Sequence, residues 1–520
     1  MSLYRAFILA ALTSPSLTAL HYPTVQISQL EHLLVDTDGD YRSGFKDAIT
    51  PCTNYVSGSQ NLGRETAAQW MRVAFHDFVT ARSIEGSGGV DASIGFETER
   101  EENSGAAFND SFRYWSSFVN SKVSMADLVA LGTVTSVGNC GGPKVLYRGG
   151  RIDAAGSGPS GVPAPDTDLD TTLKFFANAG FNQVDSIKLT ACGHTLGSVH
   201  HEGFPTVMDN STTSPNNTAG AGHLDITNAG FDADVVHEYL NGTREKGGPL
   251  VTSFNESSRS DLRLYNSDGN STMQSLAHSG AIGFSSTCAE LLGRMIDTVP
   301  KSVQSQMTDV IDPIQVKPVN VSFDIDQSGA FRLYGSIRFL VTKSTSVPPS
   351  TATITAGIAT QTASASSANG SGIYGASSYF PFSLSFPRNE ALPSTLTTLF
   401  SNAVVHDFTL QPKAFFIPSM SSATPSGDSS SSVSITAAVY NGNSSWSSVA
   451  RIAYPVTQQG TLAPKMVTKN VSLKSSGGPA PYNMFVGTTA LPTTALSQVS
   501  VDVVASDGSQ EFLDEFNLFL

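Results

Sequence analysis

Two short segments of the chain carry residues whose types and spacing could support acid–base chemistry. In the first, Arg72 and His76 stand four positions apart in a stretch with helical periodicity, so both side chains project from one face. The pair places a fixed cation beside a titratable base. An arginine and a histidine on one helix face are on their own usually a solvated surface. The second segment, in which His194 stands between Gly193 and Thr195, makes a functional site the better interpretation.

The two segments read Arg72-Val73-Ala74-Phe75-His76-Asp77 and Gly193-His194-Thr195-Leu196-Gly197. In this order they resemble the R-x-x-F-H-D and G-H-T-x-G motifs of the haem peroxidases of plants, fungi and bacteria. The resemblance extends over about residues 63–288 and does not cover the C-terminal part. It is similar to the secreted fungal type (class II-like), although such proteins usually carry more cysteines. The resemblance implies a catalytic domain that binds haem b.

The resemblance also implies a role for each polar residue around that cofactor. His194 would be the axial ligand of the haem iron, and Asp261 would accept the other N–H of its imidazole. His76 would move a proton between the two oxygens of hydrogen peroxide, first as a base and then as an acid. Arg72 would stabilise the negative charge that develops as the O–O bond breaks. Because His76 must begin neutral, we expect burial and the nearby Arg72 to lower its pKa.

Three further assignments rest on the same resemblance. Phe75 resembles the distal phenylalanine of the secreted members. Asn103 resembles the asparagine that accepts the second N–H of His76, with Glu97 behind it, although the stretch from Ser93 to Asn103 looks short beside fungal relatives. Asp261 could otherwise be a surface residue that begins a helix.

The sequence predicts two calcium sites, one next to each histidine. Hard oxygen ligands suit Ca²⁺, and both regions offer carboxylate, carbonyl and hydroxyl oxygens. Either region alone could be a turn in which Asp and Thr act as local caps. The distal set is Asp77, Gly89, Asp91 and Ser93. The proximal set, which follows the spacing of fungal secreted peroxidases, is Thr195, Asp225, Thr227, Gly230 and Asp232.

Helical periodicity dominates the part of the chain that must position these residues. A length of 520 residues exceeds what one hydrophobic core normally supports, so we expect two domains. The predicted helices bury one face against each other and leave a cleft for a cofactor, as a mainly α peroxidase domain requires. We place this domain at residues 20–300. Examples of the predicted helices are residues 25–34, 64–79, 125–137, 169–179, 184–196, 233–240 and 287–295.

Beyond a linker at residues 301–318 the hydrophobic period changes from near 3.6 to 2. Alternating runs recur at short spacing, which predicts an all-β, sandwich-like domain over residues 319–520. A Ser/Thr/Ala-rich interval, residues 342–378, interrupts the pattern and could be a long mobile loop or carry O-linked sugar. Carbohydrate binding, attachment to a cell wall and packing against the first domain all remain open as roles for the β domain.

The first nineteen residues have the features of a signal peptide: Arg5, an apolar run over residues 6–12, and small residues up to Ala19. A membrane anchor is the alternative, but this run is too short to cross a bilayer of about 30 Å. We therefore expect residues 1–19 to be removed and the protein to be secreted. No later segment reaches transmembrane length. Secretion agrees with the glycosylation sequons, which include Asn109, Asn210, Asn216, Asn241, Asn255, Asn320 and Asn470.

Charge and composition narrow the possible partners. A net charge of −14 argues against nucleic acid or an anionic membrane surface as a partner. Only 14% of the residues are charged, as in secreted glycoproteins that owe part of their solubility to sugar. We expect a monomer whose partners are hydrogen peroxide and a small reducing substrate, with possible cell-wall or carbohydrate contact through the β domain.

The chain has four cysteines, and an oxidising compartment favours disulfides. The resemblance to fungal peroxidases implies a bridge between Cys52 and Cys140. Cys192 could pair with Cys288, but Cys192 lies in an apolar helix two residues before His194, where a free buried thiol is an equal alternative.

These observations favour a secreted haem peroxidase that reduces hydrogen peroxide and oxidises small phenolic or dye-like donors by one-electron steps. A different class of protein remains open, namely a secreted, glycosylated binding or cell-wall protein that keeps a peroxidase scaffold without turnover. The presence of Arg72, His76 and His194 favours the enzyme.

Overall fold

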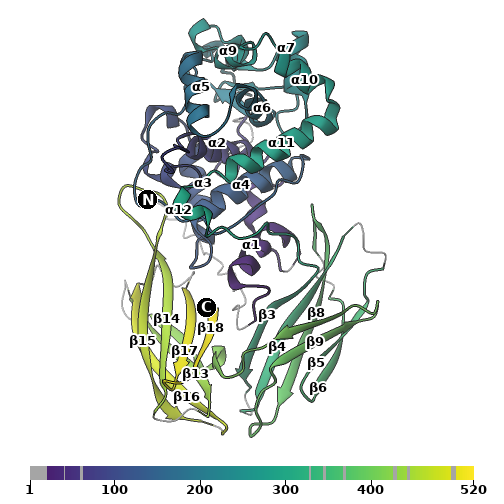
Figure 1. Cartoon of the computed structure of the whole chain (residues 1–520), viewed down its shortest axis with the longest axis vertical. Coiled ribbons are helices and arrows are strands. Elements are labelled where there is room, and N and C mark those ends of the chain that lie inside the picture. The colour runs from purple at the N-terminus through teal and green to yellow at the C-terminus, as the bar shows by residue number, and fades with distance from the viewer. Residues whose placement is uncertain are drawn as a thin grey trace, which may run out of the picture.

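The chain forms a helical part followed by a β-rich part. Figure 1, drawn from the computed structural model, shows the helices at one end of the molecule and two groups of strands side by side at the other. The predicted signal peptide, residues 1–19, lies outside the described residues. The structure describes residues 20–39, 41–58, 63–326, 329–342, 347–366, 370–425, 430–441, 445–478, 480–492 and 499–519.

Helices occur where the sequence shows a period of 3.6, and a two-stranded hairpin lies among them. No helix in the described ranges combines the length and the apolar character needed to cross a membrane. The helices are α1 (Val25–Val35), α2 (Thr66–Val79), α3 (Ala107–Trp115), α4 (Met125–Asn139), α5 (Leu169–Asn178), α6 (Gln183–Gly193), α7 (Asp234–Asn241), α8 (Pro249–Thr252), α9 (Ser260–Tyr265), α10 (Ser271–His278), α11 (Gly280–Ile296) and α12 (Lys301–Gln304). The hairpin pairs β1 (Ser198–His200) with β2 (Ala221–His223).

One predicted helix was too long at its C-terminal end. The prediction continued to residue 196, but α6 ends at Gly193 and His194 is its C-cap. The chain turns away because Gly197 adopts a left-handed backbone conformation (φ 93°), which glycine tolerates and which leads into β1. A Cβ atom at position 197 would lie only 2.6 Å from Cβ of Ala68, so this glycine also allows the turn to approach α2 closely.

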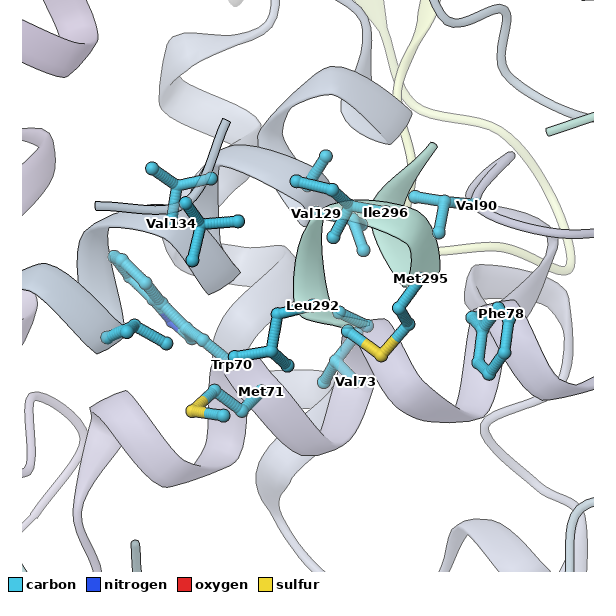
Figure 2. Close-up of a cluster of buried hydrophobic side chains, with 14 of the residues drawn as sticks. Trp70, Met71, Val73, Phe78, Val90, Val129, Val134, Leu292, Met295 and Ile296 are labelled. Carbon is cyan, nitrogen blue, oxygen red and sulfur yellow. The ribbon is translucent and has the colours of Figure 1, made fainter. Parts of the chain in front are cut away.

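Helix α4 runs through the centre of the helical part. Every residue from Met125 to Val137 is buried, so this helix is covered on all sides. Figure 2 shows buried side chains of α2 and α11 packed against α4. Trp70 and Val73 of α2 lie in the same buried cluster as Val129 of α4 and Leu292 of α11. This packing holds α2 at a fixed distance from the rest of the helical part.

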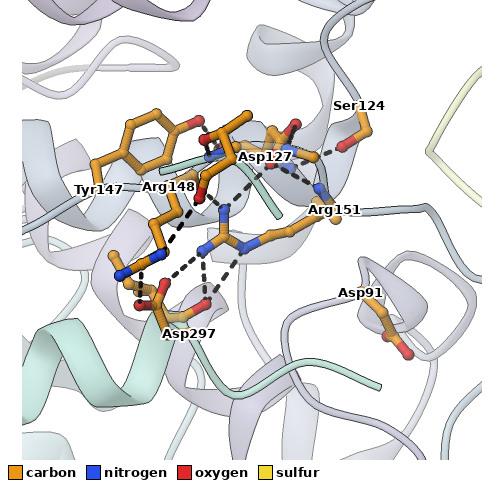
Figure 3. Close-up of polar contacts among 12 residues, drawn as sticks. Asp91, Ser124, Asp127, Tyr147, Arg148, Arg151 and Asp297 are labelled. Atoms are coloured by element: carbon orange, nitrogen blue, oxygen red, sulfur yellow. Dashed lines mark hydrogen bonds and ion pairs between the residues drawn. The ribbon is translucent and has the colours of Figure 1, made fainter. Parts of the chain in front are cut away.

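A buried ion pair connects α4 to the loop that follows it and to the end of α11 (Figure 3). The carboxylate of Asp127 accepts hydrogen bonds from the backbone N–H groups of Gly150 and Arg151 and from the guanidinium of Arg151 at 3.2 Å. The same guanidinium donates to the carbonyl of Ile296 at 2.7 Å and contacts Asp297 at 3.3 Å. Because both members of the central pair are completely buried, the pair must stay intact for this junction to hold.

The strands of the β-rich part fall into two groups, a first and a second β unit, as Figure 1 shows. Two buried clusters of apolar side chains lie in this part, and the first of them also includes side chains of β11, β13 and β16 in the second unit. Alternation along the strands could not reveal which sheet a strand joins. The first unit contains β3 (Val316–Ile325), β4 (Phe331–Val341), β5 (Thr351–Ala356), β6 (Ala359–Ser364), β7 (Gly370–Gly372), β8 (Gly375–Phe386), β9 (Thr395–Phe400) and β10 (Val405–Thr409). The second contains β11 (Ala414–Phe416), β12 (Ser422–Pro425), β13 (Ser430–Tyr440), β14 (Ser447–Val456), β15 (Lys465–Gly477), β16 (Tyr482–Pro492), β17 (Val499–Ser506) and β18 (Glu511–Phe519).

In the first unit, two four-stranded antiparallel sheets, in the orders β3-β4-β8-β7 and β10-β9-β5-β6, enclose a shared core. In the second, one sheet runs in the order β11-β13-β16-β15-β14-β17-β18, with β12 pairing to β13. The interval at residues 342–378, for which the sequence left a mobile loop open, contains β5, β6, β7 and the beginning of β8. The sequence did not predict these strands because Thr and Ala alternate along them, and these small side chains differ little in hydrophobicity.

A buried charge cluster joins α1 to the first β unit. Glu31 of α1 is fully buried and lies 2.5 Å from the ammonium of Lys317 in β3. Arg338 of β4 binds Glu31 and also contacts Asp36 at 2.8 Å, while the Tyr379 hydroxyl donates to Asp36 at 3.0 Å. Two cations of the first β unit face two carboxylates of the N-terminal segment, so ionic contacts hold α1 and the first β unit together.

Replacement of Arg338 by methionine should therefore strongly destabilise the whole chain. Two buried carboxylates, Glu31 and Asp36, would each lose one cationic partner, which costs about 3–5 kcal/mol. Urea unfolding followed by circular dichroism would measure the change. Arg42→Met is the matched control, because Arg42 forms a surface ion pair with Asp47 whose members are 56% and 54% exposed, and its loss should cost at most about 1 kcal/mol. Equal effects of the two substitutions would contradict the role of the cluster.

Candidate active site

A cavity of about 800 Å³ lies between α2 and the C-terminal end of α6. Arg72, Phe75 and His76 of α2 line it, and so do His194 and Asp261. The two histidine segments, more than one hundred residues apart in the sequence, therefore meet at one cavity. The α2 residues face it because positions 72, 75 and 76 share one side of the helix.

Asn103 fixes the imidazole of His76 from behind. Nδ1 of His76 lies 2.7 Å from Oδ1 of Asn103, whose amide nitrogen donates to the carbonyl of Glu97 at 2.8 Å. Since the Asn103 oxygen can only accept, Nδ1 of His76 carries the proton and Nε2 keeps a free lone pair. Burial and then the charge of Arg72 lower the pKa of His76 to about 3, so the ring is neutral at ordinary pH.

Arg72 is held by backbone carbonyls at the cavity wall. Its guanidinium donates to the carbonyl of Ser104 at 2.9 Å and to that of Glu102 at 3.3 Å. It also lies over the rings of Phe108 and Phe204, with 4.9 Å and 5.2 Å between its central carbon and the ring centres. Burial lowers the pKa of Arg72 to about 10, so the group remains a cation at neutral pH.

His194 is oriented by Asp261, the second residue of α9. Its Nδ1 lies 2.6 Å from the Asp261 carboxylate, which is itself buried. Burial alone would lower the pKa of His194, but the charge and the hydrogen bond of Asp261 outweigh it and raise the pKa above its usual value. With Nδ1 engaged, Nε2 is the nitrogen that remains for a metal ion in the cavity.

Phe75 belongs to the apolar lining of the same cavity. Its ring packs at 5.7 Å from that of Phe176, and Leu189, Leu264 and Met295 continue the lining. The cavity thus combines apolar walls with a few polar groups in fixed positions, which is typical of cofactor sites.

The structure also gathers the residues of the predicted distal calcium set. The carboxylate of Asp77 accepts hydrogen bonds from the backbone N–H groups of Asp91, Ala92 and Ile94 and from the hydroxyl of Ser93. Gly89 has a left-handed backbone (φ 105°), and a Cβ atom there would lie 2.3 Å from the carbonyl oxygen of Thr298, so only glycine fits this position. The Asp77 carboxylate thus brings Asp91 and Ser93 together directly after His76.

The proximal set is gathered in the same way. The Thr195 hydroxyl donates to the carbonyl of Asp232 at 2.8 Å and lies 3.4 Å from the Asp225 carboxylate, which also accepts from the Thr227 N–H at 2.9 Å. The Gly230 N–H donates to the carbonyl of Thr227. In the part of the chain that the structure describes, no group of three or more His, Cys, Asp or Glu side chains could hold a metal ion.

Both pairs of cysteines form disulfides. Cys52 bonds to Cys140, as predicted, and Cys192 bonds to Cys288. The free thiol that the sequence left open at Cys192 was therefore wrong. This second bridge ties α6 to α11, which the sequence could not show because apolar surroundings suit a thiol and a disulfide alike.

Two residues of the cavity wall escaped the sequence analysis. Glu65 is the N-cap residue of α2 and Gln69 lies one turn later, and both line the cavity. Glu65 is only 7% exposed and accepts a hydrogen bond from the Asn228 amide at 2.6 Å. Burial raises the pKa of Glu65 from 4.5 to about 7. Glu65 stands four residues before Gln69 and seven before Arg72, a helical spacing that puts all three on one face of α2. This spacing was the signal that could have placed Glu65 and Gln69 at the cavity.

The raised pKa of Glu65 predicts a specific pH dependence of stability. Between pH 4.5 and about 7 the folded state holds a proton that the unfolded chain releases, so stability falls as pH rises through this window. The Glu65→Gln variant lacks this proton, and relative to it the wild type should lose about 2–3 kcal/mol of unfolding free energy between pH 5 and pH 7.5. Urea unfolding at both pH values measures the difference. Glu256→Gln, at a position 85% exposed, should show none, and parallel curves for Glu65→Gln and wild type would contradict the assignment.

Comparison with known proteins agrees with this geometry. Residues 53–279 match the family model described as Peroxidase. The putative L-ascorbate peroxidase 6 of Arabidopsis thaliana is 35% identical over 156 residues, which is 28% of this chain and 45% of that protein. The mitochondrial cytochrome c peroxidase of Candida albicans is 30% identical over 168 residues, which is 31% of this chain and 45% of that protein.

Another relative matches a longer stretch of the chain, and its name does not mention a peroxidase. A WSC domain-containing protein of Arthroderma benhamiae is 36% identical over 348 residues, which is 66% of this chain and 45% of that protein. The matched part of this chain thus spans less than half the length of each of these three relatives. The family match and the plant and fungal relatives together support one conclusion: over residues 53–279 this chain carries a domain of the peroxidase superfamily.

Proposed function

We propose that this protein is a haem-dependent peroxidase of the secreted fungal type, which reduces hydrogen peroxide and oxidises small phenolic or dye-like donors by one-electron steps. The observation that carries the proposal is that His76 and His194 face one cavity with their Nδ1 atoms engaged by protein groups. Nε2 of His194 therefore remains for a metal ion, and Nε2 of His76 remains for a proton. Arg72 adds a fixed cation beside them.

The residues of the cavity fit haem b. His194 offers Nε2, and the walls of Phe75, Phe176, Leu189 and Met295 are apolar, as a flat macrocycle requires. When bound, haem supplies an iron centre that exchanges electrons with peroxide. The carboxylate of Asp261 would keep the imidazole of His194 in place and increase its electron donation.

The remaining chemistry belongs to α2. Nε2 of His76 is unprotonated, so it can take a proton from one peroxide oxygen and return it to the departing one. Asn103 keeps the ring in the tautomer that this transfer needs. The guanidinium of Arg72 is already held by the Ser104 and Glu102 carbonyls, so it can stabilise developing negative charge without reorganisation.

A second candidate function is a binding or cell-wall protein on a peroxidase scaffold without turnover. The WSC domain-containing relative favours it, since that protein is not named for peroxidase activity. Secretion, glycosylation at the sequons, and contact of the β units with a cell wall or carbohydrate belong to either function and remain proposals. So do the monomeric state and the absence of nucleic-acid partners.

Loss of the proton carrier separates the two functions. His76→Leu should slow the reaction with hydrogen peroxide by about 10²–10⁴-fold, because no other group replaces the base. Stopped-flow absorbance near the Soret band measures this rate, and haem content measured in parallel should be unchanged. His278→Leu, at an exposed position, is the control. Haem binding with equal peroxide reactivity in wild type and His76→Leu would refute the acid–base role.

Calcium at both oxygen sets is part of the same proposal. The donors are all oxygens, and each set lies directly after a cavity histidine, at Asp77 and at Thr195. A chelator selective for Ca²⁺ should therefore lower the melting temperature, since removal of a ligand bound only by the folded state removes its stabilisation.

Differential scanning fluorimetry with EGTA, followed by addition of Ca²⁺ or Mg²⁺, tests the calcium assignment. Ca²⁺ should restore the melting temperature and Mg²⁺ should not, because Mg²⁺ demands a smaller octahedral site. Asp232→Asn should weaken the response. A melting temperature that EGTA leaves unchanged would show that the hydrogen bonds within each set are sufficient.

A further inference from the structure

The hairpin formed by β14 and β15 reaches from the second β unit to the helical part (Figure 1). Its strands pair as far as Val456 and Lys465, and residues 457–464 between them form what we call the hairpin tip. Ala463 of the tip is 4% exposed and belongs to the buried apolar cluster of the helical part, against which Met466 of β15 also packs. The hairpin tip therefore packs against the helices, although its strands belong to the second β unit.

The hairpin tip lies on a short helical turn, η3 (Ser93–Phe96). The backbone N–H of Leu462 donates to the carbonyl of Gly95 at 3.3 Å. A Cβ atom at position 95 would lie 2.8 Å from Oγ1 of Thr461 and 2.8 Å from a ring carbon of Phe112. Because glycine has no side chain, the tip can approach the backbone of η3 closely enough for this hydrogen bond.

η3 leads directly to the group that orients His76. The N–H of Glu97, the residue after η3, donates to the carbonyl of Ile94 at 3.0 Å, and the Glu97 carbonyl accepts the amide of Asn103 at 2.8 Å. Asn103 in turn accepts the Nδ1 proton of His76. The N–H of Ile94 donates to the carboxylate of Asp77, next to His76, at 3.0 Å. A displacement of η3 would therefore disturb His76 from two sides.

The hairpin tip keeps one shape through its own hydrogen bonds. The side-chain amide of Gln458 donates to the carbonyl of Ala463 at 3.1 Å, and the N–H of Ala463 donates to Oγ1 of Thr461 at 3.2 Å. A mobile loop would do little to fix η3, whereas a tip of defined shape can hold it in place.

We propose that the hairpin tip positions His76 for proton transfer by holding η3, with Leu462 and Ala463 as positioning residues. This inference rests on the proposed function, because it gives the second β unit a role in the reaction that His76 performs. Neither Leu462 nor Ala463 lines the cavity, so both act through η3 and Asn103. The Glu97 side chain also accepts the N–H of Gly158, so loss of the tip should loosen η3 without unfolding it.

Three variants and one control test this role. Replacement of residues 457–464 by Asn-Gly closes β14 and β15 with a two-residue turn, which keeps the strands paired but no longer reaches η3. Leu462→Pro removes only the donated N–H, while Leu462→Ala keeps it and shortens a side chain that is 39% exposed. Lys122→Met is the matched control, because Lys122 joins the same β unit to the loop before α4 through Glu515 at 2.9 Å.

Hydrogen exchange followed by mass spectrometry, on the full-length protein with its cofactor, measures η3 directly. Peptides covering residues 93–103 should exchange about fivefold faster in the shortened hairpin and in Leu462→Pro, as expected for the loss of one hydrogen bond. The stopped-flow rate with hydrogen peroxide should fall by about 10- to 100-fold in both, because a misplaced base transfers protons poorly. Leu462→Ala and Lys122→Met should match wild type in both measurements.

The outcomes separate this inference from the proposed function. Wild-type exchange in the shortened hairpin, or in Leu462→Pro if the shortened chain does not fold, would overturn the positioning role. Faster exchange with an unchanged peroxide rate would overturn it as well, and so would equal effects of Lys122→Met, since any contact between the parts would then suffice. A wild type that does not react with peroxide would refute the proposed function, and the exchange at residues 93–103 would still decide whether the tip holds η3.

Discussion

The chemistry of the cavity depends on how its two histidine rings are held. Each ring uses Nδ1 to bind a group behind it, Asn103 for His76 and Asp261 for His194. Each therefore directs its Nε2 lone pair toward the shared space. The surroundings of the two rings differ, and this difference sets their roles. Burial and the charge of Arg72 lower the pKa of His76 and keep it neutral, whereas the Asp261 carboxylate raises the pKa of His194 and makes it a stronger electron donor.

The helical framework keeps these two rings in register. Buried side chains of α4 and α11 pack against α2, and the Cys192–Cys288 bridge fastens α6 to α11. At the cavity rim, Gly197 lets the turn after His194 approach α2, and Glu65 reaches across to Asn228 in the loop beyond. The two walls of the cavity are thus connected through covalent, apolar and polar contacts at once.

The β units are integrated with this framework through charge rather than through a flexible linker. Glu31 and Asp36, at the N-terminal helix, form ion pairs with Lys317 and Arg338 of the first β unit. A second contact, between Lys122 and Glu515 at 2.9 Å, reaches the last strand of the second unit.

The sequence by itself determined the helical periodicity, the change to strands and the polar residues of the cavity, because these follow from local spacing along the chain. Only the tertiary structure decided that α6 stops before His194, that the strands divide into two units and that Cys192 is bridged. It also revealed Glu65 and the Glu31–Arg338 cluster. Burial and pairing between distant segments decide such features, and a buried carboxylate has the same letter in the sequence as a solvated one.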